Sequence, residues 1–291
     1  MTFHGSLVAI ITPFRNGTVD EKALGDLIEW QIANGTDGIV PCGTTGESAT
    51  LTHEEHKRVV EFTIEAVKRR VPVIAGTGSN ATDEAIEFTR HARSAGADAA
   101  LLISPYYNKP TQEGLYRHHK AIAEAVDIPQ ILYNIPGRTA VNMAPATVAR
   151  LATVKNIVGI KEGAGSLQQV SEIVQACGDR FTVLAGDDAL TLPMMAVGAT
   201  GVITVTANVA PAEMAALVDA WETGNVAKAR ALHFKLYPLF QALFFETNPV
   251  PVKHALALMG RATADVRLPL CAMSQENLDK LTRVMKDYGL V

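Results

Sequence analysis

One construction repeats about eight times along this chain: a short run of β-branched and aliphatic residues, then an amphipathic stretch of helical period. The runs begin at intervals of roughly 20 to 35 residues, which is the size of one strand–helix unit. They predict strands at residues 7–11, 38–40, 71–75, 99–104, 130–133, 158–161, 182–185 and 201–205. Helices are predicted between them, among others at residues 21–34, 53–69, 83–95 and 115–126. Thr52 with Glu55 forms a capping-box pattern at the start of the second helix, and Gly35 and Gly96 follow the first and third.

The alternation of strand and helix predicts an α/β fold. The chain lacks a clear Gly-x-Gly-x-x-Gly turn, which would have indicated an open doubly wound sheet. Eight successive units are enough to close a barrel, so we predict a (β/α)8 TIM barrel. After residue 205 the pattern changes to helices, at 211–223, 226–245, 251–260 and 275–288. We therefore expect a barrel over residues 1–224 and a C-terminal helical region over residues 225–291 that packs on it.

The composition excludes several classes of partner. With 26 Lys and Arg against 30 Asp and Glu, the formal net charge is -4, so we expect neither nucleic acid nor an anionic membrane as a partner. Hydrophobic residues make up 48% of the 291 residues, enough for a large core. No run reaches the roughly 18 apolar residues of a membrane span. The first residues do not resemble a secretion signal, and we expect a cytoplasmic protein.

The most distinctive chemical feature is Lys161, which follows the uncharged run 157–160 and is predicted at the end of a buried strand. In a barrel the active site lies where the strands end. Burial would lower the pKa of the amine and free its lone pair, so that it could attack a ketone and form an imine. The alternative is a lysine whose ammonium group extends to water.

Other strand ends carry further candidates. The turn Gly43-Thr44-Thr45-Gly46 offers hydroxyl and N–H groups that could bind a small carboxylate or phosphate, or it could serve turn geometry alone. Tyr107 and Tyr133 could relay protons, or could be packing residues. Arg138, after Pro136-Gly137, could bind a carboxylate with its fork of donors, or pair with an acidic side chain.

Metal and thiol chemistry are weakly supported. His53 and His56 are three residues apart, whereas the helical zinc motif has a spacing of four. Asp187-Asp188 could bind magnesium or cap a helix. Cys42, Cys177 and Cys271 are distant from one another and odd in number, which argues against disulfides. Cys42 could be nucleophilic at its strand end, but with no histidine near it in the sequence, packing is the simpler role. We expect no metal.

Three segments together resemble the dihydrodipicolinate synthase family of class I, lysine-dependent aldolases: 43–47 (GTTGE), 133–139 (YNIPGRT) and 159–162 (GIKE). The likeness extends along nearly the whole chain, through 104–108 (SPYYN), 186–188 (GDD) and 202–208 (VITVTAN). It implies condensation of pyruvate with L-aspartate 4-semialdehyde to 4-hydroxy-tetrahydrodipicolinate, the first committed step of diaminopimelate and lysine biosynthesis. It also implies an imine on Lys161 and no dissociable cofactor.

The resemblance assigns roles to further residues. Tyr133, Thr44 and Tyr107 match the proton-relay triad of the family, in which the counterpart of Tyr107 reaches into the site of a neighbouring subunit. Thr45 matches a residue that binds the pyruvate carboxylate, and Arg138 one that receives the second substrate. The backbones of Gly186 and Ile203 line the pocket, and a homotetramer built from two tight dimers is implied.

A second set of positions matches those at which feedback-sensitive members bind L-lysine between subunits. These positions are Ser48, Ala49, His53, His56, Asn80, Glu84 and Tyr106. We therefore expect inhibition by L-lysine, although an ordinary polar interface would also explain them. One departure is Gly163-Ala164-Gly165, where many members have Ala followed by Thr or Ser.

Two other functions remain open. One is a related aldolase, such as N-acetylneuraminate lyase or a keto-deoxy-sugar-acid aldolase, which would share Lys161 and Tyr133. Arg138 discriminates, because it suits a short carboxylated aldehyde rather than a sugar chain. The other is a non-catalytic barrel that senses a ligand.

Overall fold

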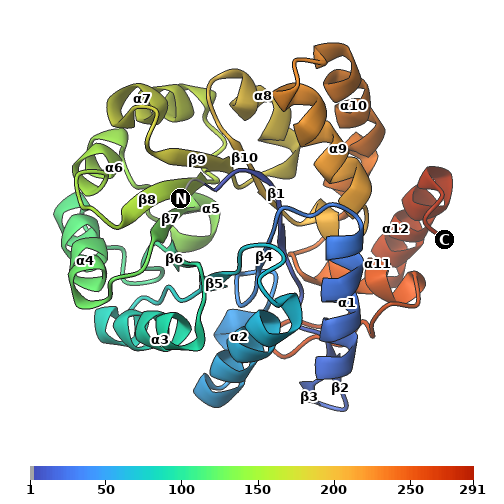
Figure 1. Cartoon of the computed structure of the whole chain (residues 1–291). Helices are drawn as coiled ribbons and strands as arrows, with labels where there is room; N and C mark the ends of the chain where they lie inside the picture. Colours follow the sequence, from blue (N-terminus) through green and yellow to red (C-terminus); the bar gives the residue numbers. More distant parts are fainter. Residues whose placement is uncertain (1–2) are drawn as a thin grey trace.

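Eight parallel strands form the inner wall of the structure, a computed structural model that describes residues 3–291 (Figure 1). In chain order they are β1 (Gly5–Ala9), β4 (Gly38–Val40), β5 (Ile74–Gly76), β6 (Ala99–Ile103), β7 (Gln130–Asn134), β8 (Ile157–Glu162), β9 (Thr182–Ala185) and β10 (Gly201–Thr204). The order around the sheet is β4-β1-β10-β9-β8-β7-β6-β5. The ends of this sheet meet through the single bridge Ile39–Val73 and a hydrogen bond of 2.9 Å from Gly76 N to Pro41 O, which leaves a barrel that is nearly closed.

Helices surround this wall and continue past it. Those that follow the strands are α1 (Glu21–Ala33), α2 (His53–Val67), α3 (Thr82–Ala95), α4 (Gln112–Ala125), α5 (Pro136–Thr139), α6 (Pro145–Leu151), α7 (Leu167–Cys177), α8 (Thr191–Ala196) and α9 (Pro211–Glu222). Three more, α10 (Val226–Ala242), α11 (Val250–Leu258) and α12 (Gln275–Tyr288), lie on one side of the barrel, where α10 packs against α9 (Figure 1). Short elements complete the chain: the hairpin β2 (Phe14–Arg15) and β3 (Thr18–Val19), and the 3-10 turns η1 (Ser48–Thr50), η2 (Asp188–Leu190) and η3 (Thr206–Asn208).

Local sequence signals explain where the helices begin and end. Thr52 Oγ1 accepts the N–H of Glu55 at 3.2 Å while the Glu55 carboxylate accepts the N–H of Thr52 at 2.9 Å, which confirms the capping box of α2. Gly96 ends α3 at a φ of +97°, a conformation that other residues rarely adopt.

The strands have nearly continuous apolar sequences because both of their faces are buried. Their inward side chains, such as Leu7, Ile74, Leu101 and Ile203, fill the barrel interior. Their outward side chains pack against the helices in a larger core. The carboxyl ends of the strands are therefore held rigidly between two apolar layers.

The predicted (β/α)8 barrel with appended C-terminal helices is confirmed, with shifts at element ends. The strand predicted at 71–75 begins only at Ile74, because Pro72 has no N–H to pair. The helix predicted at 226–245 ends at Ala242. The expected boundary at residue 224 falls in the turn between α9 and α10, and a division into two domains there stays a prediction. Within residues 3–291, no helix is both long and apolar enough to cross a bilayer.

Candidate active site

Lys161 lies near the carboxyl end of β8, where its backbone is level with Tyr133 on β7 and Leu184 on β9. Its side chain points into the barrel, as its alternation with Glu162 requires. The residue is 5% exposed, and its Nζ lies 4.5 Å from the centre of the Tyr133 ring. The amine and the phenol are thus held side by side in a buried place.

A cavity of about 40 Å³ opens next to this pair. Its walls include six of the site residues predicted from the sequence: Lys161, Tyr133, Thr44, Thr45, Arg138 and Gly186. Ile203 is fully buried in the barrel interior and does not line this cavity, although Val205 just after the same strand does. A space of this size admits only a small molecule.

Tyr107 is, besides Ile203, a predicted catalytic-site residue that the structure does not bring to the cavity. It is 89% exposed, in the loop after β6, with a φ of +72°. A large aromatic residue rarely holds such a conformation in open solvent.

The turn after β4 has the form of an anion site. Its backbone is closed by hydrogen bonds of 3.1 Å from Gly46 N to Gly43 O and from Glu47 N to Thr44 O. Within residues 3–291 no acceptor takes the N–H of Thr44 or Thr45. Thr45 Oγ1 accepts the Asn248 amide at 3.0 Å, so its own proton is left to donate. These three donors favour the carboxylate-binding interpretation over turn geometry alone.

Arg138 has no acidic partner among the described residues, which removes the alternative of an ordinary ion pair. It lies on α5, and its Nη2 donates to the backbone oxygen of Asn248 at 3.0 Å. Asn248 therefore holds both Arg138 and Thr45, a role that our sequence analysis missed. Only the tertiary contact between the segment before α11 and the barrel mouth reveals it.

A second missed residue is Glu162, which lies behind Lys161 on the side of α7. Its carboxylate accepts hydrogen bonds from Asn134 Nδ2 at 3.0 Å, Gln169 Nε2 at 3.1 Å and Ala164 N at 2.6 Å. Burial raises its pKa, and these hydrogen bonds oppose that rise. The network joins the ends of β7 and β8, which carry Tyr133 and Lys161.

The candidate metal-binding and thiol residues have structural roles. Asp187 caps η2 by accepting Ala189 N at 2.9 Å, which is the helix-cap interpretation of the acidic pair. Asp188 is buried and accepts Thr206 N at 2.7 Å, and burial raises its pKa. Cys42 is buried, which raises the pKa of its thiol and keeps it protonated, so it is a packing residue. Among residues 3–291 no group of three His, Cys, Asp or Glu side chains could bind a metal ion.

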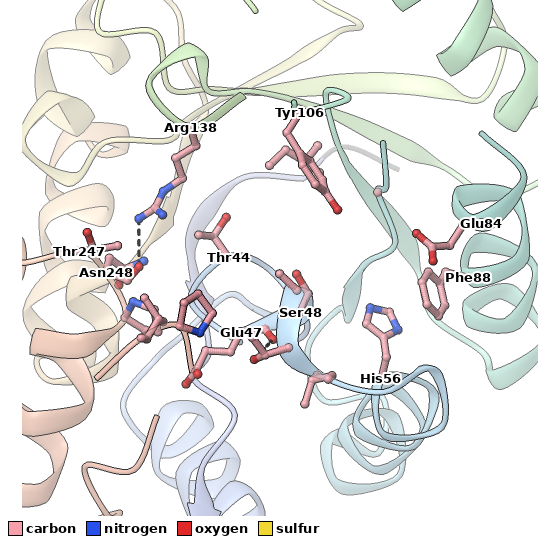
Figure 2. A pocket seen from close by; sticks show the side chains of 18 of the residues that line it. Thr44, Glu47, Ser48, His56, Glu84, Phe88, Tyr106, Arg138, Thr247 and Asn248 are labelled. Carbon is pink, nitrogen blue, oxygen red and sulfur yellow. Dashed lines mark hydrogen bonds between the residues drawn. The ribbon is translucent and has the colours of Figure 1, made fainter. Parts of the chain in front are cut away.

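A larger pocket of about 440 Å³ lies beside the cavity and shares Thr44, Arg138 and Asn248 with it. In Figure 2, Arg138 and Asn248 lie on one side, Glu84, Phe88 and His56 on the other, and Thr44 and Ser48 between them. Six of the seven positions matched to lysine binding line it: Ser48, Ala49, His53, His56, Glu84 and Tyr106. The seventh, Asn80, is outside the lining and donates to the backbone of Tyr106 at 3.2 Å.

This pocket combines a carboxylate with aromatic surface. Glu84 accepts from Ser79 and contacts His53 Nε2 at 2.9 Å. The ring of His56 lies 4.2 Å from that of Phe88, and burial lowers the pKa of His56 to about 4. His56 is therefore neutral at pH 7, and Glu84 is the anionic group on this side.

The chain matches the sequence profile described as "Dihydrodipicolinate synthetase family" over residues 2–288. The chain belongs to this family. A 4-hydroxy-tetrahydrodipicolinate synthase of Syntrophus aciditrophicus is 64% identical over 289 residues, which cover 99% of each chain. Such full-length identity favours the dihydrodipicolinate synthetase reading over a related sugar-acid aldolase.

Two solved members of the dihydrodipicolinate synthetase family carry ligands. The Acinetobacter baumannii enzyme, complexed with pyruvate, has a TM-score of 0.98 and 47% identity over 100% of both chains. The Cyanidioschyzon merolae enzyme, with lysine bound, has a TM-score of 0.97 and 40% identity over 99% of both chains.

Proposed function

We propose that this chain condenses pyruvate with L-aspartate 4-semialdehyde to 4-hydroxy-tetrahydrodipicolinate through an imine on Lys161. The observation that carries the proposal is the buried amine of Lys161 beside Tyr133, in a small cavity that Thr44 and Thr45 also line. Full-length relatives that are 4-hydroxy-tetrahydrodipicolinate synthases support it.

The cavity residues suit the first chemical step. The N–H groups of Thr44 and Thr45 and the Thr45 hydroxyl would bind the pyruvate carboxylate and so place the ketone carbon at Lys161. The Lys161 nitrogen attacks that carbon, and loss of water leaves an imine. Tyr133 would carry protons to and from the departing oxygen, with Thr44 as the next member of the relay. No dissociable cofactor takes part, because the protonated imine itself withdraws electrons.

The second step forms a carbon–carbon bond. Loss of a methyl proton gives an enamine, whose terminal carbon attacks the aldehyde of the second substrate. The amino group of that substrate then attacks the imine carbon, which closes the ring and releases Lys161. Arg138, held by Asn248 and without an acidic partner among residues 3–291, would bind the second carboxylate. Gly186 and Ile203 would contribute backbone near the pocket.

The proposal extends to assembly and regulation. We expect Tyr107 to complete the relay in a neighbouring subunit, within a homotetramer of two tight dimers, which would account for its exposure. We also expect L-lysine to bind in the larger pocket, with Glu84 facing its ammonium group. Cytoplasmic location stays a prediction.

Trapping the imine tests the reaction. Incubation with pyruvate and sodium borohydride should add mass to the protein, and the modified peptide should contain Lys161. Lys161→Ala should abolish the label and lower turnover by at least about a thousandfold. Lys155→Ala, which changes an exposed lysine before β8, should leave both unchanged. Folded protein that acquires no label would exclude the imine mechanism.

A titration with L-lysine tests regulation. We expect activity to fall at millimolar L-lysine, and we expect Glu84→Gln to raise the half-inhibitory concentration about tenfold, because one charged partner is lost. Unchanged activity of the parent protein at millimolar L-lysine would refute the regulatory proposal and leave the imine chemistry untouched.

A further inference from the structure

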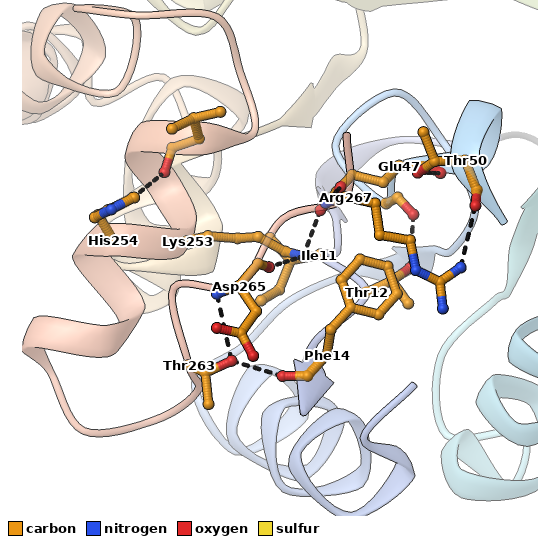
Figure 3. A network of polar contacts seen from close by, with 12 residues as sticks. Ile11, Thr12, Phe14, Glu47, Thr50, Lys253, His254, Thr263, Asp265 and Arg267 are labelled. Atoms are coloured by element: carbon orange, nitrogen blue, oxygen red, sulfur yellow. Dashed lines mark hydrogen bonds and ion pairs between the residues drawn. The ribbon is translucent and has the colours of Figure 1, made fainter. Parts of the chain in front are cut away.

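A buried ion pair joins the C-terminal region to the turn after β4 (Figure 3). Lys253, on α11, has a side chain that is 0% exposed, and its Nζ contacts a carboxylate oxygen of Glu47, whose side chain is 1% exposed. Neither residue lines the cavity beside Lys161. The pair therefore acts on the cavity only through the backbone that it holds.

Every charge of this pair has additional partners. Lys253 Nζ donates to the backbone oxygen of Asp265 at 2.8 Å and lies 4.0 Å from the centre of the Phe14 ring. The second oxygen of Glu47 accepts the N–H of Arg267 at 3.1 Å. These contacts compensate for the loss of water around both charges.

The Arg267 guanidinium continues the network towards α2. It donates to both oxygens of Glu55 at 2.6 Å and to the backbone oxygen of Thr50 at 3.1 Å. The segment between α11 and α12 is thereby fixed to both ends of the 47–55 stretch.

Glu47 is the residue that closes the turn. Its N–H donates to Thr44 O at 3.1 Å, and its φ of +52° is a conformation that residues with a side chain seldom adopt. Thr12 Oγ1 holds the neighbouring Gly46 oxygen at 2.7 Å from the other side. The direction of the Thr44 and Thr45 N–H groups thus depends on where the Glu47 side chain is anchored.

We propose that Lys253 is a positioning residue, which holds Glu47 so that the N–H groups of Thr44 and Thr45 face the substrate carboxylate beside Lys161. Stability alone is a poor reason for such a pair, since apolar residues of similar size often stabilise an interior equally well. An ion pair with defined partners instead fixes the distance between two backbones. The inference rests on the proposed function, because it assigns the carboxylate of pyruvate to this turn.

The test is borohydride trapping at a series of pyruvate concentrations on the full chain. For Lys253→Met we expect the half-saturating pyruvate concentration to rise about tenfold, as one weakened hydrogen bond to a charged group would cause. The labelled peptide should still contain Lys161. Glu47→Gln, which keeps the volume of the side chain, should raise the same concentration in the same direction. Near-ultraviolet circular dichroism should show that each variant is folded.

The control is Lys280→Met, which removes an exposed lysine of α12 that pairs with Glu276, and it should bind pyruvate as the parent does. If Lys253→Met does not fold, Glu47→Gln decides. A folded variant with lower thermal stability but an unchanged half-saturating concentration would overturn the inference while leaving the proposed function in place. A parent protein without label would overturn both.

Discussion

The end of β8 carries two ionisable residues of opposite orientation. Lys161 points into the barrel, and Glu162 points towards α7, where three donors surround its carboxylate. Burial raises the pKa of Glu162, and the hydrogen bonds oppose that rise. A buried hydrogen-bond network thus lies directly behind Lys161.

Glu162→Ala should destabilise the protein by about 2–4 kcal/mol, because the Asn134 and Gln169 amides and the Ala164 N–H would lose a buried acceptor. Urea unfolding measures this change. Glu172→Ala, an exposed change on α7, should stay within about 0.5 kcal/mol of the parent. Equal values for the two variants would mean that the network contributes nothing.

The catalytic residues predicted from the sequence share one property: each lies at the end of a predicted strand or a few residues after it, where the fold determines its position. Lys161, Tyr133 and Thr44 could be brought to one place in this way. Asn248 and Lys253 could not, because they reach the turn after β4 from a region without strands, and only the packed structure shows that contact. Exposure of Tyr107 was equally invisible.

At the scale of elements, α2 and α4 contain histidines that are buried in the neutral form. Burial lowers the pKa of His56 and of His118 to about 4, and that of His119 well below its usual value. Once unfolded, each would bind a proton below a pH of about 6.5. The unfolded state then binds more protons, so the free energy of unfolding falls as pH decreases from about 6.5 towards 4.

His119→Leu should remove part of this acid sensitivity. Neither ring nitrogen of His119 has a hydrogen-bond partner among residues 3–291, so no contact is lost. Between pH 6 and 5 the variant should lose about 1.2 kcal/mol less stability than the parent. Urea unfolding at both pH values gives the slope, with the exposed His4→Leu as control. Parallel slopes for all three proteins would contradict the assignment.

Buried carboxyl groups act in the opposite direction. Burial raises the pKa of Asp37, Glu162 and Asp188, so the folded state keeps protons that the unfolded state loses above a pH of about 4. Their contribution lowers stability as pH rises through that range. This carboxyl contribution is the same in the parent and in His119→Leu. The difference in slope between these two proteins therefore reports on His119 alone.

Most elements could be predicted because their signals are local. The capping box of α2 and the glycine after α3 determine helix ends within a few residues. Three element ends shift by three residues: β5 begins at Ile74, after Pro72, which has no N–H to pair, while α4 begins at Gln112 and α10 ends at Ala242. The number of strand–helix units predicts that the barrel closes. That β4 and β5 meet through one isolated bridge could not be predicted from the sequence of either strand.

For the whole molecule, the exposure of Tyr107 means that one chain does not bring together the three residues that the resemblance assigns to the proton relay. The loop that carries it is tied to its own chain by hydrogen bonds of 2.9 Å from Asn108 N to Tyr106 O and from Asn108 Nδ2 to Asn80 O. The loop is therefore defined, and its tyrosine points away from the described residues.

Mixing two inactive variants tests this arrangement. A Lys161→Ala subunit still has Tyr107, and a Tyr107→Phe subunit still has Lys161. A dimer of one subunit of each kind would therefore contain one complete site. After random reassociation at equal amounts, we expect about a quarter of the parent activity, since half of the dimers are mixed and each has one working site. Activity no greater than the sum of the separate variants would place Tyr107 outside a shared site.

The order of residues along the chain has a consequence for synthesis. The turn after β4 leaves the ribosome early, whereas Lys253 and Arg267, which hold it, are among the last residues to emerge. β1 likewise cannot pair with β10, its neighbour in the sheet, until β10 has been synthesised. A nascent chain or a premature termination product that stops before α11 would carry Lys161 and Tyr133 but an unanchored turn. On the proposed role of Lys253, we therefore expect such a product to bind pyruvate weakly.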